Sequence, residues 1–281
     1  LGTAVVQINL IIDSIVASLL VAGSISWLYY SDRLVELPLG VFGIAIATVI
    51  LPKLSERFSK NSMEEYSEMI KKALKIAIVF SLPAMFGLLV LTEHIISTLF
   101  QYGNFKITDT LMSSLSLLTY SVGLPAFILM KVLLTGFFSR QDTLTPVKYG
   151  AVAVMFNITM NLSVVFYYMN NPFQGAHALL ALATSLSAWL QVILLYRRLK
   201  KEGIVADNCL INRDFLKSFI SCILMSLLLI FLLPELNKWV SYEYYLRGLY
   251  LIFYVLLGAL IYFLSMKVFK TNFRQMIYEN N

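Results

Sequence analysis

The sequence predicts an all-α membrane protein, a polytopic bundle of about eight transmembrane helices. Of its 281 residues, 59% are hydrophobic and only 14% are charged, and the mean hydropathy is +0.76. A soluble domain of this length could not bury so much apolar surface. The apolar residues also come in blocks of about 20, the length of helix that crosses a bilayer. Because a bilayer offers no partner for unpaired backbone groups, each block is expected to be helical.

Hydropathy divides the chain into eight candidate spans joined by more polar connections. The spans are residues 3–24, 34–52, 73–97, 111–138, 147–169, 175–196, 215–233 and 246–266. The connection 53–72 mixes both charge signs. Its segment from Ser62 to Ile70 has the pattern of a short capped amphipathic helix on the membrane surface, and a solvated linker with helical character is the alternative.

The basic residues predict how the spans are oriented. Of the 22 lysines and arginines, 17 fall at the C-terminal end or near 53–72, 139–147 and 197–214. The four on the opposite side are Arg33, Lys106, Lys238 and Arg247, and Lys131 lies within a span. The positive-inside rule predicts that the larger group, including both chain ends, is cytoplasmic. The net charge of +6 therefore reflects topology, and nucleic acid is not an expected partner.

The sequence holds no recognisable enzyme motif. We find no pair of catalytic carboxylates, no Ser-His-Asp set, no metal-spaced histidines or cysteines and no glycine-rich phosphate loop. His94 and His177 are isolated near span ends, where a solvated or hydrogen-bonded histidine is the expected role. Cys209 and Cys222 are expected to be reduced thiols. The sequence therefore predicts a membrane protein that is not an enzyme.

Arg33 is the most unusual residue of the chain, because it lies at or just inside the edge of a predicted span. A charge near the bilayer centre costs about 2.5–3.5 kcal/mol even on lenient insertion scales, so such residues usually face a cavity. A guanidinium there fits an anionic passenger, since it can bind phosphate through a bidentate fork. The alternative is a local ion pair with Asp32 or Glu36, or a guanidinium that reaches back to the interface.

A second group of polar residues falls inside the predicted spans. It comprises Asp13 in the first span, Asn157 and Asn161 in the fifth, and Thr184 in the sixth. The two asparagines are four residues apart and therefore share one helix face. Together the four side chains offer oxygen ligands for a hard cation such as Na⁺. An interhelical hydrogen-bond cluster without an ion is the favoured alternative.

Several motifs follow one another in a specific order over most of residues 1–150. They are Gln7-Ile8-Asn9; the run from Ser26 to Pro38 with Gly40-Val41-Phe42-Gly43; the run from Phe100 to Phe105; and Tyr120-Ser121-Val122-Gly123-Leu124 with the runs 137–143 and 145–148. In order and spacing they resemble the lipid II flippase family (MurJ, also called MviN) of the MOP exporter superfamily. The later spans agree with that family in number and topology.

The resemblance implies a two-lobed, V-shaped bundle of 14 helices around a cationic cavity. This chain would match helices seven to fourteen. Residues 1–200 would form the second six-helix lobe, and residues 201–281 would form two additional C-terminal transmembrane helices and a cytoplasmic tail. The first lobe, which carries several of the family's essential arginines, would lie outside this chain, which starts at Leu1 rather than at an initiator Met.

The resemblance also implies roles for single residues. Arg33 matches the family's cavity arginine that is thought to hold a diphosphate, and Ser26, Asp32 and Glu36 lie near it as further substrate-binding residues. Asp13, Asn157, Asn161 and Thr184 resemble a cation site, proposed here for Na⁺. One ligand of that site can be acidic where this chain has Asn161.

The implied function is export of lipid II, the lipid-linked peptidoglycan precursor, from the inner to the outer leaflet of the bacterial cytoplasmic membrane. Membrane potential or a cation gradient would drive it rather than ATP, and no cofactor beyond Na⁺ would be needed. Expected partners are lipid II, membrane lipids, the first lobe and cell-wall synthesis proteins. The alternatives are a flippase for another polyprenyl-diphosphate glycan, a drug exporter of the same superfamily, or a membrane scaffold for cell-wall enzymes.

Overall fold

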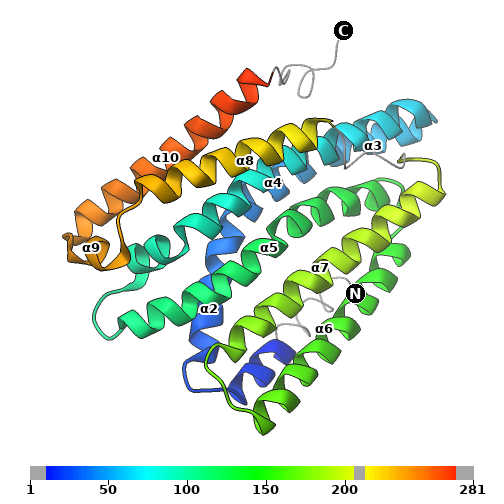
Figure 1. The fold of residues 1–281 in the computed structure, drawn as a ribbon. Helices are drawn as coiled ribbons and strands as arrows, with labels where there is room; N and C mark the ends of the chain where they lie inside the picture. The colour runs from blue at the N-terminus through cyan, green and yellow to red at the C-terminus, as the bar shows by residue number, and fades with distance from the viewer. Residues whose placement is uncertain (1–10, 206–212, 270–281) are drawn as a thin grey trace.

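The fold is a bundle of long helices, as a computed structural model of the chain shows (Figure 1). The structure describes residues 11–205 and 213–269, and every regular element within those ranges is a helix. The elements are α2 (Ser24–Pro38), η1 (Leu39–Ile44), α3 (Ala45–Ser59), α4 (Met63–Phe100), α5 (Ile107–Phe138), α6 (Leu144–Asn170), α7 (Ala176–Lys201), α8 (Arg213–Leu232), α9 (Leu236–Ser241) and α10 (Tyr244–Val268).

Seven helices within the described part of the chain are long and apolar enough to cross a membrane. They confirm seven of the eight predicted spans and identify a multi-pass membrane protein. The first predicted span, 3–24, lies partly outside the described residues. Gln7 and Asn9 are among the residues outside them. Residues 11–18 are helical and residues 19–23 form a turn, so that helix ends earlier than predicted.

The second predicted span is much longer than hydropathy indicates. Residues 24–59 form one continuous helix of α2, η1 and α3 rather than a span over 34–52. Gly23 starts it with a left-handed φ of +102°. Pro38 interrupts the hydrogen-bond ladder because it has no N–H, and the next six residues form a π-helical segment. The helix accommodates the proline by widening and does not end there.

The predicted connection 53–72 is almost entirely helical. Only residues 60–62 separate α3 from α4, so neither a separate surface helix nor a long linker is present. Asn61 adopts a left-handed φ of 55°, and the N–H groups of Asn61 and Ser62 donate back to Phe58 and Arg57 at 3.0 Å. This is the Schellman arrangement that ends a helix and reverses the chain. Ser62 makes no side-chain cap.

Helix α5 occupies the centre of the bundle, between α4, α7 and α2. Small side chains let it approach α7 closely, as is usual between membrane helices. A Cβ added at Gly123 would lie 2.9 Å from the Cα of Ser185. The Ser185 hydroxyl in turn donates to the Thr119 carbonyl at 2.8 Å.

Helices α8 and α10 form a separate pair that packs along α4 (Figure 1). The Tyr262 hydroxyl on α10 donates to the Val79 carbonyl on α4 at 2.7 Å and lies 2.8 Å from the Ser218 hydroxyl on α8. Trp239 on α9 is fully buried and donates to the Thr98 hydroxyl at 2.9 Å. The pair is thus attached to one side of the bundle, and the domain boundary near residue 200 stays a prediction.

Both histidines act as buried hydrogen-bonding groups. His94 Nε2 lies 3.0 Å from the Pro234 carbonyl, and His177 Nε2 lies 2.9 Å from the Met112 carbonyl. Each ring therefore donates to a backbone oxygen of another segment. Cys222 is a buried free thiol, and Cys209 lies outside the described residues.

Candidate functional site

One face of α2 carries the polar side chains that sequence analysis singles out. Ser26, Tyr29, Arg33 and Glu36 are exposed and recur at the three- to four-residue spacing of one helix face. The opposite side of the helix is buried. It consists of Ser24, Leu28, Ser31, Leu34 and Val35. We call the set Ser26, Tyr29, Arg33 and Glu36 the α2 polar face.

Arg33 is held in place by two neighbours on this face. Its Nη1 lies 2.6 Å from Glu36 Oε2, and its guanidinium lies 5.0 Å from the centre of the Tyr29 ring. The Arg33 and Glu36 side chains are 52% and 49% exposed, so the guanidinium is supported without being enclosed. The structure therefore contains the local ion pair that sequence analysis left open, and it keeps part of the cation accessible to an anion.

The structure lengthens the helix that carries this site. Arg33 directly precedes the predicted span 34–52, and it lies within the continuous helix 24–59. Its place at the edge of the membrane stays a prediction. Asp32, the fourth predicted substrate residue, is half-buried rather than exposed beside Arg33. Tyr29 was not among the predicted residues, although its position four residues before Arg33 is a signal that could have found it.

The buried side of α2 is bonded to α5 at two points. Trp27 Nε1 donates to Asp109 Oδ1 at 2.9 Å, and the Ser31 hydroxyl donates to the Ser113 carbonyl at 2.7 Å. Both contacts join residues 82 positions apart. Sequence analysis missed Asp109, for which the only local signal is its place in the first turn of a helix.

The predicted cation ligands do come together. Asn161 Nδ2 donates to Asp13 Oδ1 at 2.7 Å and to Asn157 Oδ1 at 2.9 Å, and Asn157 Nδ2 donates to the Thr184 hydroxyl at 3.2 Å. Both asparagines are fully buried. The four residues thus form a chain of hydrogen bonds from the 11–18 helix through α6 to α7, which is the interhelical cluster of the alternative interpretation.

The same residues keep the chemistry of a hard-cation site. One carboxylate, two amide carbonyls and a hydroxyl supply oxygen ligands, and the amide oxygen and nitrogen exchange places by a rotation of the side chain. Within the described residues no group of three or more His, Cys, Asp or Glu side chains has metal-binding geometry. A transition-metal centre of that kind is not formed there, whereas a site for Na⁺ with neutral oxygens stays a prediction.

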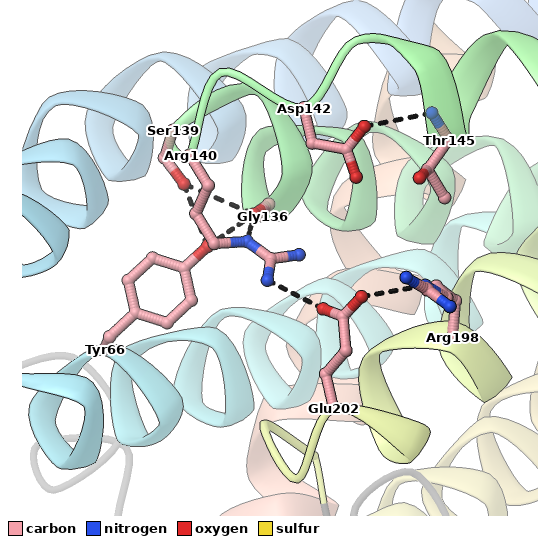
Figure 2. A network of polar contacts seen from close by, with 8 residues as sticks. All are labelled: Tyr66, Gly136, Ser139, Arg140, Asp142, Thr145, Arg198 and Glu202. Atoms are coloured by element: carbon pink, nitrogen blue, oxygen red, sulfur yellow. Dashed lines mark hydrogen bonds and ion pairs between the residues drawn. The ribbon is translucent and has the colours of Figure 1, made fainter.

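A second polar network joins the ends of α4, α5 and α7 (Figure 2). Glu202 lies between two arginines, with Oε2 at 2.7 Å from Arg140 Nη1 and Oε1 at 2.8 Å from Arg198 Nε. Arg140 Nε also donates to the Gly136 carbonyl at 3.1 Å, and the Tyr66 hydroxyl donates to the same oxygen. The network is on the side of the membrane that the basic residues predict to be cytoplasmic, and it fixes three helix ends to one another.

The connection from α5 to α6 belongs to this network. Gln141 adopts a left-handed φ of 61°, and Asp142 Oδ1 accepts from the Thr145 backbone N–H at 3.0 Å (Figure 2). Burial alone would raise the pKa of Asp142, but the hydrogen bonds from Thr145 and the charges of Arg140 and Arg198 lower it overall. The ionised carboxylate thus stabilises the start of α6.

Comparison with known proteins identifies the family. The family model described as "Lipid II flippase MurJ" matches residues 1–250. A probable lipid II flippase MurJ of Haemophilus influenzae is 38% identical over 268 residues, which cover 93% of this chain and 51% of that protein. A probable lipid II flippase MurJ of Vibrio cholerae is 47% identical over 203 residues, which cover 72% of this chain and 37% of that protein.

A solved structure is also similar. A lipid II flippase MurJ in an inward closed conformation superposes with a TM-score of 0.78 at 26% identity, covering 99% of this chain and 53% of that chain. The chain spans about half the length of the curated relatives it matches most fully. The match of the family model over most of the sequence, together with these relatives and this fold, shows that the chain belongs to the MurJ family of lipid II flippases.

Proposed function

We propose that this chain takes part in moving lipid II from the inner to the outer leaflet of the bacterial cytoplasmic membrane, and that the α2 polar face binds the diphosphate of the lipid. The observation that supports this most is the half-exposed Arg33 side chain within a helix that is long and apolar enough to cross a membrane. A charge inside a membrane needs water, a counter-ion or a polar ligand. A diphosphate supplies several oxygens in the geometry that a guanidinium fork recognises.

Glu36 gives Arg33 a partner when no lipid is bound. The ion pair at 2.6 Å keeps the guanidinium oriented, and half of each side chain stays exposed. A diphosphate carries more negative charge than one carboxylate and competes for the same N–H groups. Binding would therefore exchange one anionic partner of Arg33 for another, which favours reversible capture and release.

We infer that a membrane potential or a cation gradient drives the export, since the sequence has no glycine-rich phosphate loop for ATP. Asp13, Asn157, Asn161 and Thr184 are the residues that would hold a coupling Na⁺. The excess of basic residues at the C-terminal end and around the polar network of Figure 2 supports a cytoplasmic location for that side. Cell-wall synthesis proteins are the partners that such a function implies.

The proposal is tested in a depletion strain that relies on a chimaera of this chain with the first half of the Haemophilus influenzae relative. Arg33→Ala and Arg33→Lys should both abolish growth while the protein is still expressed, because lysine keeps the charge but loses the bidentate fork. Arg197→Lys is the matched control, since Arg197 is an exposed arginine at the end of α7. Normal growth with either Arg33 variant would refute the diphosphate contact.

A further inference from the structure

We propose that Trp27 and Asp109 are positioning residues for substrate binding: they hold α2 in the rotation that turns Arg33 away from the bundle. This role rests on the function proposed above, because it concerns the same α2 polar face. Neither residue touches that face. They act from the opposite side of the helix, where α2 meets α5 and α7.

The Asp109 carboxylate links two helices through its two oxygens. Oδ1 accepts from the Trp27 indole N–H at 2.9 Å, and Oδ2 accepts from the Lys106 backbone N–H at 2.8 Å. The second bond belongs to the cap at the start of α5. The carboxylate is therefore fixed by its own helix before it receives the indole, and it offers α2 an acceptor of defined position.

Besides this bond, two neighbouring residues lie against the indole of Trp27. Its ring centre lies 4.9 Å from that of His177, which is fully buried and bonded to the Met112 carbonyl. A Cβ added at Gly23 would come within 2.7 Å of the ring. The space for the indole thus exists because residue 23 is a glycine, whose φ of +102° also starts the helix. Gly23 and His177 thus border the space that the Trp27 indole occupies.

Fixing Trp27 sets the rotation of the whole helix. Residues 27, 31 and 34 follow one another at helical spacing toward α5, and Ser31 adds its bond to the Ser113 carbonyl. At about 100° per residue, Arg33 lies about 120° round the helix axis from Trp27. Arg33 therefore points away from the bundle when Trp27 points toward it. If α2 rotates or slides, Arg33 and Glu36 move together away from the position in which they are exposed.

The first test compares two tryptophans that make the same kind of bond. Trp27→Phe keeps an aromatic ring against His177 but removes the N–H donor. Trp189→Phe is the matched control, because Trp189 Nε1 donates to the Val122 carbonyl at 3.0 Å and so joins α7, not α2, to α5. In proteoliposomes containing the chimaera, Trp27→Phe should slow lipid II translocation about fivefold, the change in population that one lost hydrogen bond produces. Trp189→Phe should leave it unchanged.

The Asp109→Ala variant and the double variant show whether the two residues act as one unit. Asp109→Ala should slow translocation at least as much as Trp27→Phe, because it also removes the bond to the Lys106 N–H. The double variant should be no slower than Asp109→Ala alone, since the contact with Trp27 is already lost there. The positioning role would be overturned if the fold losses in translocation rate multiply in the double variant. It would also be overturned if Trp27→Phe and Trp189→Phe slow translocation equally.

A second readout reports the rotation of α2 without any lipid. In a background with Cys209→Ala and Cys222→Ala, Ser26→Cys marks the exposed side and Val35→Cys marks the side that is 3% exposed. Trp27→Phe should raise thiol labelling at 35 relative to 26 by about fivefold, the change in population that one lost hydrogen bond produces. Trp189→Phe should not change this ratio.

The labelling ratio also separates the two proposals from each other. An unchanged ratio in Trp27→Phe overturns the positioning role, even if lipid II is transported. A changed ratio in a chimaera that never moves lipid II supports the positioning of α2 and counts against the proposed substrate instead.

Discussion

Replacing Glu202 with glutamine should destabilise the protein by about 2–3 kcal/mol. The substitution keeps the shape of the side chain and removes the charge that lies between Arg140 and Arg198 (Figure 2). The Arg140 side chain is only 13% exposed, so its charge would lose its partner without gaining full hydration. Breaking a fully buried pair costs about 3–5 kcal/mol, and the 23% exposure of Glu202 reduces that figure.

A surface ion pair of similar length provides the control. Lys60 Nζ lies 2.6 Å from Glu56 Oε1, and these side chains are 60% and 56% exposed. Glu56→Gln should therefore cost much less than Glu202→Gln. The free energy of unfolding is measured in bicelles by denaturant titration for both variants. The reasoning is wrong if Glu202→Gln costs no more than Glu56→Gln, because burial would then make no difference to the pair.

Three smaller predictions follow from the packing and the turns. Gly123→Ala should lower the free energy of unfolding by about 1–3 kcal/mol in the same titration, because the new Cβ would lie 2.9 Å from the Ser185 backbone. Gln141→Gly should raise the melting temperature, since glycine removes about 1 kcal/mol or more of strain at a φ of 61°. The lowered pKa of Asp142 contributes stability that is complete above about pH 4, the unfolded value, and is lost as the pH falls through the folded one. Asp142→Asn should therefore flatten the acid limb of a melting-temperature profile, and an unchanged limb would contradict the assignment.

Hydropathy predicts where this chain crosses the membrane because bilayer thickness fixes the length of an apolar block. It does not predict where a helix ends. The helix α4 begins at Met63, ten residues before the predicted span, because polar residues continue the same hydrogen-bond ladder outside the apolar layer. The same effect places Arg33 inside a helix rather than at its edge.

Helical spacing predicts part of the site for a similar reason. Asn157 and Asn161 share a face because they are four residues apart, and the structure brings both to Asp13 and Thr184. Whether those oxygens face an ion or one another depends on side-chain rotation, which spacing does not determine.

Contacts between distant helices escape sequence analysis of a single chain. Asp109 is 82 positions from Trp27. An acidic residue is expected in the first turn of a helix in any case, so its presence there does not indicate a contact with Trp27. The π-helical segment Leu39–Ile44 is equally hidden. Pro38 indicates an interruption of the helical hydrogen bonds there. A kink, a helix break and a widened turn can each accommodate a residue without an N–H, so the sequence does not say which one forms.

The central claim is that Arg33 on the α2 polar face binds a lipid diphosphate, and its most direct test is a binding measurement on purified chimaera. Affinity is measured for lipid II and for the matching lipid that carries one phosphate, with the unsubstituted protein and with Arg33→Lys. The account predicts that the unsubstituted protein prefers the diphosphate and that Arg33→Lys weakens lipid II binding by about 10- to 100-fold, the loss of a charge-assisted bidentate contact. Equal affinity of both proteins for lipid II, or no preference for the diphosphate, would contradict it.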